Sequence, residues 1–337
     1  MGRPSRSAGY HRAVAHPRSQ AALALALLSA CSTPAFEVRE GSGHDDLWLG
    51  GRWVLREVHD PRPRGTPPLV RYHQQIVLPG GTDFVTRGEG PGLYPHHRGV
   101  FLGWNQTRHG SRTTDFWHCR NGARIVRESA SARFASGALT RTATLAWIDG
   151  SGQTVLRESR RTRIEAEGED VVVLDYDIEL HATAGEVVLD GDAQHAGFHF
   201  RAADEVAARP EATAVVFAEG ARELTDVPAS AKGAAFADAR WVAQRYTIAG
   251  RPCTVLHLDH PGNPRPTVYG VRAYGRFGAF PRVRLVPGAP VRLRYRLVVL
   301  ALAAGEARAG AAALERRWQE YARAVVDPPR PGGSASP

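Results

Sequence analysis

The segment VVVLDYDIEL, residues 171–180, decides the fold class, because apolar and polar side chains alternate along it. From Val172 to Leu180 every second side chain is apolar, and acidic residues occupy three of the positions between them. Successive side chains of a strand point to opposite faces of a sheet. A period of two therefore predicts a strand with one buried face.

Similar alternation recurs in short segments along the chain: RWVLREV from Arg52, RIVRES from Arg124, TLAWID from Thr144, RWVAQRYTI from Arg240, CTVLHLD from Cys253 and VRLRYRLVVL from Val291. Turn-forming pairs such as Gly80-Gly81 and Pro287-Gly288 separate them, and no helical pattern lies between consecutive strands. Connections of this kind join antiparallel strands. We therefore predict an all-β fold, a large antiparallel β-sandwich, in a single domain over residues 31–326.

One helix is expected near the C-terminus, over residues 306–325. The apolar side chains that recur there at the spacing of one helix face are Leu314, Trp318, Tyr321 and Val325. Residues 327–337 are rich in Pro, Gly and Ser, which is typical of a disordered tail.

Residues 1–30 have the pattern of a signal peptide: four arginines and no acid in the first twenty residues, then an apolar run over residues 21–28. The tripeptide before Cys31, Leu-Ser-Ala, resembles a bacterial lipobox, in which the cysteine is lipidated. An ordinary secretory signal is the alternative. Eight apolar residues are too few to span a bilayer. We expect an exported protein, periplasmic or on the cell surface, attached to the membrane only through lipid on Cys31.

The charged residues argue against a nucleic-acid partner. The 337 residues carry a formal net charge of +9, and Lys232 is the only lysine. The arginines of this chain alternate with acidic residues. On nucleic-acid-binding surfaces, by contrast, basic residues cluster on one helix or one face. Two cysteines follow the signal segment, Cys119 and Cys253. The sequence leaves open whether they are close enough for a disulfide, and we expect Cys119 to be structural rather than a nucleophile.

Three segments concentrate histidine: GLYPHHRGVFLGWN over residues 92–105, TTDFWHC over 113–119 and DGDAQHAGFHFR over 190–201. In the first, Pro95 disfavours helix before it and GVFLGW reads as a buried strand, so the two histidines lie at a strand entrance. On an extended chain His96 and His97 would point to opposite faces, and we expect only one of them to enter a given site.

The third segment reads as a strand with one polar and one apolar face. His195, Gly197 and His199 share the polar face, and the opposite face, expected to point to the core, carries Ala196, Phe198 and Phe200. Because glycine has no side chain, its position between two imidazoles lets another group approach the backbone closely.

Together with LDHPGNPRPTVYGVRAYGRFGAFP from Leu258, these segments resemble the PmoA-like family, a DUF6807-type family catalogued as methane oxygenase PmoA. The resemblance runs from about Tyr72 to Val299. The matched positions are His96, His97, Arg98, Gly99, Asp115, Phe116, Trp117, Asp192, Gly197, Phe198, His260, Pro261, Asn263, Pro264, Arg265, Arg272, Tyr274, Gly275 and Phe277. Many relatives carry a Lys-Glu pair where this chain has Gln194 and His195.

The resemblance implies an exported β-rich protein with a fold like that of sugar mutarotases and other carbohydrate-active proteins. It does not imply methane oxidation, because the methane monooxygenase subunit of that name consists of membrane-spanning helices and this chain reads as sheet.

These residues suggest a protein that acts on, or binds, a carbohydrate. Imidazoles transfer protons near neutral pH, so the candidate catalytic residues of a hydrolase, lyase or epimerase are His96, His97 and His195. Planar polar groups and aromatic rings suit sugars, and the candidate substrate-binding residues are Arg98, Trp104, Asn105, Asp115, Trp117, Asp192, Asn263, Arg272, Tyr274 and Arg276.

Two alternatives stay open. The histidines and nearby carboxylates suit a divalent metal, with His118 and His199 as candidate ligands of a metal-dependent hydrolase or oxygenase. A lipoprotein that binds sugar without catalysis would need only the same cleft.

Overall fold

The computed structural model describes residues 35–60, 62–64, 68–183, 185–192, 194–218, 223–224, 238–302 and 309–324. These residues belong to one compact unit. The expected signal peptide, Cys31 and residues 327–337 lie outside the described residues. No helix in the described part of the chain is long and apolar enough to cross a membrane.

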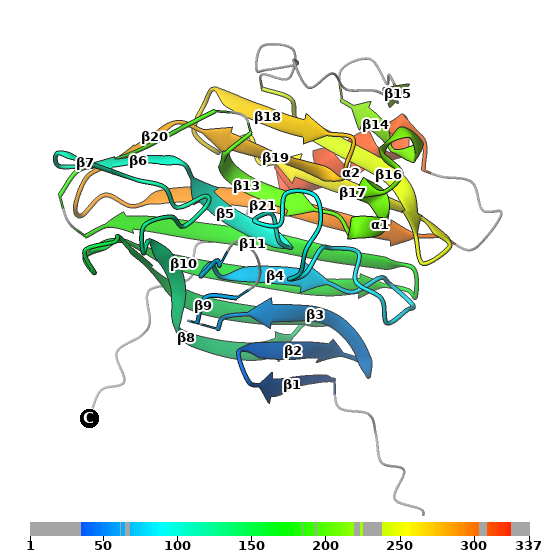
Figure 1. Ribbon diagram of the computed structural model, residues 1–337. Helices are drawn as coiled ribbons and strands as arrows, with labels where there is room; N and C mark the ends of the chain where they lie inside the picture. The colour runs from blue at the N-terminus through cyan, green and yellow to red at the C-terminus, as the bar shows by residue number, and fades with distance from the viewer. Residues whose placement is uncertain are drawn as a thin grey trace, which may run out of the picture. The chain divides into compact units, whose positions relative to one another are not determined.

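Eight strands form the sheet that carries the candidate site (Figure 1). In sheet order they are β1 (Phe36–Gly41), β2 (His44–Leu49), β3 (Arg52–Val58), β4 (His73–Ile76), β5 (Val100–Trp104), β13 (Ala196–Arg201), β19 (Arg276–Pro281) and β18 (Thr267–Arg272).

A second sheet has nine strands, and a third has four. The order in the second is β15 (Glu223–Leu224), β14 (Ala214–Phe217), β16 (Trp241–Ile248), β17 (Arg251–Asp259), β21 (Val291–Ala301), β11 (Val171–Ala182), β10 (Thr154–Glu167), β9 (Ala138–Ile148) and β8 (Arg124–Ala135). The order in the third is β20 (Val283–Leu285), β12 (Val187–Asp190), β6 (Gln106–His109) and β7 (Arg112–Thr114).

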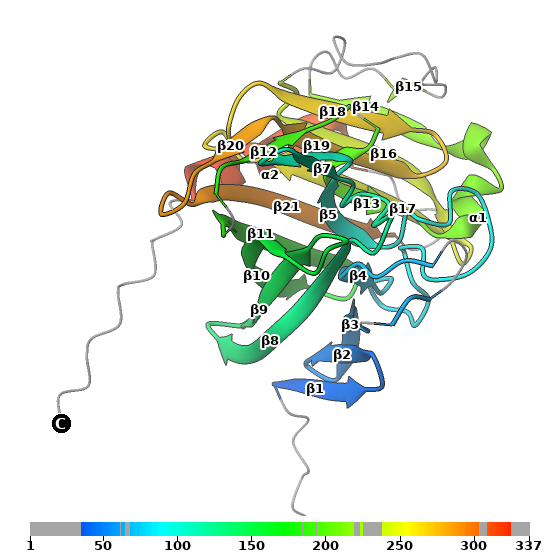
Figure 2. The ribbon, with the colours of Figure 1, turned by 60° about the vertical axis from the view of Figure 1, so that its left-hand side comes forward.

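The two large sheets form two layers with the main core between them (Figure 2). Phe198 of β13 shows the contact between the layers, because its ring stacks on Tyr295 of β21 at 4.7 Å between centroids. The sheet neighbours Leu102 and Phe277 are fully or almost fully buried in the same core. Within the described residues, all pairs of named strands are antiparallel. The predicted antiparallel, mostly β fold is confirmed.

Strand β11 contains the segment 171–180 and has the two faces predicted for it. Leu174 and Ile178 are fully buried in the core between the sheets. On the opposite face Asp175 forms a paired contact with Arg296 of β21, at 2.6 and 2.9 Å. The acidic positions of the alternating pattern therefore make cross-strand ion pairs on the outer surface of the nine-stranded sheet.

The C-terminal helix is confirmed as α2, Ala311–Arg323. Its Leu314 and Tyr321 are buried against a second apolar cluster on the outer face of the nine-stranded sheet. The helix begins five residues after the predicted start, and Val325 lies outside the described residues. Two short elements were not predicted, α1 (Asp204–Ala207) and the 3-10 turn Pro210–Ala212.

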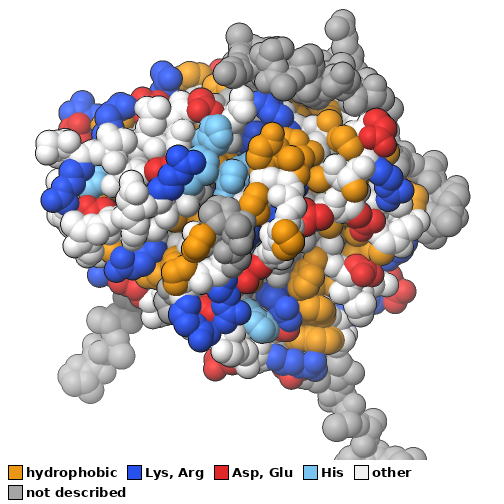
Figure 3. Space-filling model, viewed as in Figure 1, with side chains coloured by type: hydrophobic (Ala, Val, Ile, Leu, Met, Phe, Trp, Pro, Cys, Tyr) orange, Lys and Arg blue, Asp and Glu red, His pale blue; other side chains and the backbone are white. Residues whose placement is uncertain are grey.

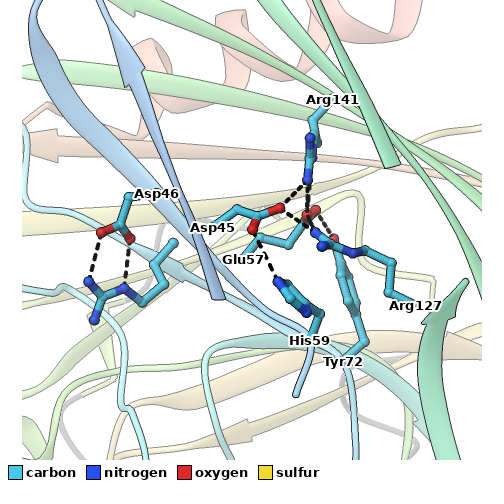
Figure 4. A network of polar contacts seen from close by, with 8 residues as sticks. Asp45, Asp46, Glu57, His59, Tyr72, Arg127 and Arg141 are labelled. Carbon is cyan, nitrogen blue, oxygen red and sulfur yellow. Dashed lines mark hydrogen bonds and ion pairs between the residues drawn. The ribbon is translucent and has the colours of Figure 1, made fainter. Parts of the chain in front are cut away.

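A buried ion cluster joins strands β2 and β3 of one large sheet to β8 and β9 of the other (Figure 4). Asp45 and Glu57 are at most 2% exposed. Arg141 contacts both carboxylates, at 2.5 Å from Asp45 and 2.8 Å from Glu57. Arg127 also contacts both, at 2.5 and 2.6 Å. Because each charge has partners of opposite sign, the cluster links the two layers at the end where β1 to β3 lie.

Candidate functional site

The site lies on the outer face of the eight-stranded sheet, over β5 and β13. Leu102 and Phe198 point from these strands into the core, which leaves the register partners Phe101 and His199 on the opposite face. Trp117 covers both, with its ring centroid 4.8 Å from Phe101 and 4.9 Å from His199. The segment that carries Trp117 therefore forms the floor of the site.

Two glycines make this close packing feasible. A Cβ on Gly103 would lie 2.7 Å from the carbonyl oxygen of Phe116, so glycine lets the covering segment lie directly on β5. Gly197 has φ +96°, and a Cβ there would overlap the carbonyl oxygen of Ala279. The close neighbour expected at Gly197 is therefore the adjacent strand β19.

Two Asp-x-x-His turns, from separate segments, form the centre of the site. Asp115 accepts hydrogen bonds from two backbone N–H groups and from His118 Nδ1, the last at 2.8 Å. Asp192 accepts one from a backbone N–H group and two from His195 Nδ1, at 3.0 and 3.1 Å. Each carboxylate holds the proton of its histidine on Nδ1, so Nε2 is left as a proton acceptor.

The imidazoles form a row. The ring centroids of His118 and His195 lie 5.2 Å apart, those of His96 and His118 lie 4.6 Å apart, and those of His96 and His97 lie 4.1 Å apart. Histidine side chains accordingly gather at one place on the face seen in Figure 3, next to hydrophobic side chains. The structure thus brings together the three histidine segments of the sequence.

The expectation that His96 and His97 point to opposite faces is wrong. They lie in a turn, closed by a hydrogen bond from His97 N to Tyr94 O at 3.0 Å, and Tyr94 has φ +52°. A turn does not alternate its side chains as an extended strand does. Both imidazoles therefore line the same cavity.

Burial favours the neutral form of His96, His97 and His195. It lowers the pKa of His96 to about 3, with nearby positive charges adding to the effect. It also places the pKa of His97 well below its ordinary value. For His195, burial lowers the pKa and the hydrogen bond and charge of Asp192 oppose it. These three rings are therefore uncharged at neutral pH, and each has one ring nitrogen that can accept a hydrogen bond.

The two aspartates remain ionised. Burial would raise the pKa of Asp115 and Asp192, but hydrogen bonds from their histidines and from backbone N–H groups outweigh it and hold the pKa of both below the ordinary value. An ionised carboxylate in this position stabilises positive charge on the imidazole bonded to it.

Two cavities meet at His96. One has a volume of about 460 Å³, within the range of ligand pockets, and its walls include His97, His195, Tyr94, Tyr274, Arg272 and Arg276. The other has a volume of about 650 Å³, and its lining includes His118 and residues 119–124. The row of imidazoles therefore borders both spaces, and His96 lines each of them.

Aromatic rings line the first cavity. Tyr94 and Tyr274 lie 4.9 Å apart between centroids. The ring of Tyr274 is parallel to His97 within 4° at 6.5 Å, and Trp117 Nε1 donates to His97 Nε2 at 3.3 Å. Tyr94 is 45% exposed at the mouth, where it offers a ring face to a ligand.

Arg71 is a residue of the candidate site that sequence reasoning missed. Its guanidinium donates to the carbonyl oxygens of Trp117 and His96 and lies 3.8 Å over the ring of Phe101. It therefore ties two of the histidine segments to each other and to β5. Its neighbourhood, LVRYHQQ, shows no signal for this role, because the contact is made by chain segments 25 and 46 residues away.

Seven of the ten predicted substrate-binding residues do not line the first cavity. Asp115, Trp117 and Asp192 are hydrogen-bonded to His118, His97 and His195, and the other four lie elsewhere. Trp104 is fully buried in the core, 6.1 Å from the ring of Trp147. Arg98 is 1% exposed and donates to two backbone carbonyl oxygens. Asn263 donates to Asp259 and to a backbone carbonyl at 2.7 Å each. Asn105 lines a separate cavity of about 600 Å³ that also reaches Asp115.

The candidate metal ligands do not form a metal site together. His199 is fully buried; its Nε2 donates to Ala196 O at 2.8 Å, and its Nδ1 accepts from Arg276 at 3.1 Å. Both ring nitrogens are thus engaged. Across the described residues, no group of three or more His, Cys, Asp or Glu side chains is placed to hold one ion.

Cys119 and Cys253 are both buried, and no disulfide joins them. Cys119 lies in a turn with φ +49°. Burial raises the pKa of its thiol to about 12, so it is protonated at neutral pH and unreactive as a nucleophile.

The comparisons identify a family and no activity. A family of unknown function (DUF6807) matches over residues 58–314, and no curated protein matches the sequence. A solved structure described as "Crystal Structure Analysis of HI1317" is similar at 7% sequence identity and a TM-score of 0.25, over 79% of this chain and 99% of that chain. A likeness at that score supports no conclusion. The family match covers most of the chain, and the protein belongs to the DUF6807 family.

Proposed function

We propose that this protein is an enzyme that acts on a carbohydrate by general acid–base catalysis, with His195 and His118 as the proton-transferring groups. One observation carries the proposal: two carboxylate-oriented imidazoles, from separate turns, lie 5.2 Å apart between centroids. Such a pair can remove a proton at one position of a substrate and deliver one at another.

The surrounding walls support a carbohydrate as the substrate. Sugars combine hydroxyl groups, which planar polar groups bind in pairs, with apolar ring faces, which aromatic side chains cover. The cavity beside His195 offers Tyr94 and Tyr274 for the second task and Arg272 and Arg276 for the first. The methane-oxygenase name attached to the resemblance plays no part in this proposal.

We also propose that the protein acts outside the cytoplasm. The arginine-rich start and the apolar run of residues 21–28 support export, and Cys31 supports attachment through lipid. Detection of lipid on Cys31 by mass spectrometry of the protein from its host tests this expectation.

The test of the function is product analysis with a panel of neutral, acidic and oxidised oligosaccharides. Mass spectrometry detects cleavage or elimination, and nuclear magnetic resonance in heavy water detects a change of configuration with uptake of deuterium. We expect at least one member of the panel to change. A glycan that binds in the cavity and never changes mass or configuration would show a sugar-binding protein without catalysis.

A metal-dependent reaction is the second candidate, and one observation favours it. Histidines that bind metals usually donate their other ring N–H to a carboxylate, as His118 and His195 do here. Against it, the described side chains bring no three donor groups to one point. Acid–base catalysis by the imidazoles themselves is therefore the function that we propose first.

Chelator treatment of the purified chain, prepared without a histidine tag, should leave turnover unchanged. The reason is that the proposed proton transfers use Nε2 of imidazoles held by carboxylates and no bound ion. The measurement is the initial rate before and after dialysis against a chelator, alongside metal content by mass spectrometry. One metal per chain that disappears in His118→Gln, with rate restored by adding the ion, would replace the present proposal by the metal-dependent one.

A further inference from the structure

The cavity beside His195 has an unbalanced charge. Two arginines, Arg272 and Arg276, contribute to its walls, and no Asp or Glu side chain does. Both are buried, at 7% and 1% exposed. Some other buried guanidinium groups, such as that of Arg141 with Glu57, contact carboxylates directly. Within the described residues Arg272 and Arg276 form no such ion pair, so the positive charge of the cavity is not matched from within its wall.

Arg272 has an unused donor. Its Nη1 donates to the carbonyl oxygen of Val271 at 2.6 Å, whereas its Nη2 is buried and has no hydrogen-bond partner among the described residues. The acid whose charge acts on Arg272 is Asp192, which is bonded to His195. Burying a donor of a charged group without a partner is unfavourable, because the group loses its hydrogen bonds to water. A ligand that accepts from Nη2 would remove that cost.

Within the described part of the chain, the hydrogen-bond partners of Arg276 are neutral groups. Its Nε donates to the hydroxyl oxygen of Tyr274 at 3.1 Å, and its Nη1 donates to His199 Nδ1 at 3.1 Å. Burial, with the charge of Arg276, places the pKa of His199 well below its ordinary value, so that ring stays neutral. The positive charge of Arg276 is therefore positioned beside the cavity without a counter-ion in direct contact.

From these observations we infer that Arg272 and Arg276 bind an anionic substituent of the sugar, and that the substituent is a carboxylate. The planar fork of a guanidinium matches the two oxygens of a carboxylate. This inference rests on the proposed function for the sugar itself. With a carboxylate as the substituent, the sugar is a uronic or aldonic acid residue. It would bind in the cavity that Arg272 and His195 both line.

The test is binding of oligosaccharides to the full chain, measured by isothermal titration calorimetry, which does not depend on turnover. The probes are oligogalacturonate, an oligosaccharide of glucuronate, their neutral counterparts and the corresponding sugar phosphates. We expect an acidic oligosaccharide to bind roughly tenfold to hundredfold more tightly than its neutral counterpart, the range that charged hydrogen bonds supply. Its affinity should fall as salt is added.

Two variants assign the effect to the cavity. Arg272→Gln should remove most of the preference for the acid and leave the affinity for the neutral sugar almost unchanged. Arg284→Gln is the matched control, because Arg284 is exposed and paired with Glu186 on the small sheet, and it should change neither affinity. Arg272→Gln should also unfold at a temperature no lower than the unchanged protein, because it removes an unpaired buried donor.

The outcomes separate this inference from the function on which it rests. Acid binding that depends on Arg272, with no sugar converted, supports the carboxylate site and overturns the proposed catalysis. Equal affinity for acidic and neutral sugars, no binding of any acidic sugar, or tighter binding of sugar phosphates overturns the carboxylate site, even if a sugar is converted.

Discussion

His195→Gln is expected to lower turnover of the sugar substrate by roughly a hundredfold to ten-thousandfold, the usual contribution of a positioned acid or base. Glutamine keeps a polar side chain of similar reach, but it does not accept and return a proton near neutral pH. The ring of His195 lines the cavity and is hydrogen-bonded to Asp192 at 3.0 Å, so its loss removes an oriented imidazole from the wall. The measurement is kcat and KM of the purified variant, with the loss expected in kcat.

The matched control is His181→Gln. His181 is 45% exposed at its side chain and lies on β11, where it contacts only Glu179 among the described residues. The control should keep full turnover and the same unfolding temperature. If His195→Gln and His118→Gln both kept full turnover, the two Asp-x-x-His turns would not be the catalytic groups.

The pH profile of Asp192→Asn gives an independent readout of the same dyad. Burial lowers the pKa of His195, and the hydrogen bond and charge of Asp192 raise it in part. A base works in its neutral form, so activity should fall as pH drops through the pKa of His195. Removing the carboxylate charge lowers this pKa further, so the acidic limb of the profile should move to lower pH while the maximal rate falls. A limb that moved to higher pH would contradict the assignment.

The fold was predictable because its strands carry a local signal. In segment 171–180 the alternation reflects a strand with one face in the core and one at the surface, and the structure confirms both faces. Strand β13 is different, because all of its residues are buried. Its outer face lies under the segment of Trp117, so His199 is covered although the sequence shows it on a polar face.

The candidate site was predictable only in part, because its geometry depends on contacts between distant segments. The sequence shows which residues the histidine segments contain. It does not show that Asp115 and Asp192 each accept a hydrogen bond from the histidine three positions later. Trp104 and Asn263 look like sugar-binding residues in sequence, yet one packs in the core and the other closes a turn. The segments that cover the sheet decide which polar or aromatic side chains face a cavity. A short sequence pattern does not show how those segments pack.

Arg141→Met is expected to lower the free energy of unfolding by about 3–5 kcal/mol, the range for breaking a buried ion pair by removing one partner. Arg141 is 5% exposed and contacts Asp45 and Glu57, which are more deeply buried (Figure 4). Methionine fills similar space but leaves Arg127 as the only cation that contacts both carboxylates among the described residues. The measurement is urea unfolding, with the midpoint reduced and the slope unchanged.

The matched control is Arg56→Met. Arg56 lies on β3 in the same region and pairs with Asp46 at 2.7 Å, but both side chains are part-exposed, at 26% and 18%. Water screens that pair, so its loss should cost about 1 kcal/mol or less. Equal effects of Arg141→Met and Arg56→Met would mean that burial does not set the strength of the cluster.

The pH dependence identifies the carboxylates as the source of the loss. In the unchanged protein, burial would raise the pKa of Glu57, but the charge and hydrogen bonds of Arg141 outweigh it and hold the pKa below the ordinary value. That stabilisation is present above the unfolded pKa of about 4.3 and is lost as pH falls through the folded pKa. Without Arg141, burial dominates and Glu57 takes up a proton more readily. The difference in unfolding free energy between Arg141→Met and the unchanged protein should therefore be largest near pH 7 and shrink toward pH 4. A difference that stayed constant over that range would assign the loss to packing of the arginine side chain instead of to its charge.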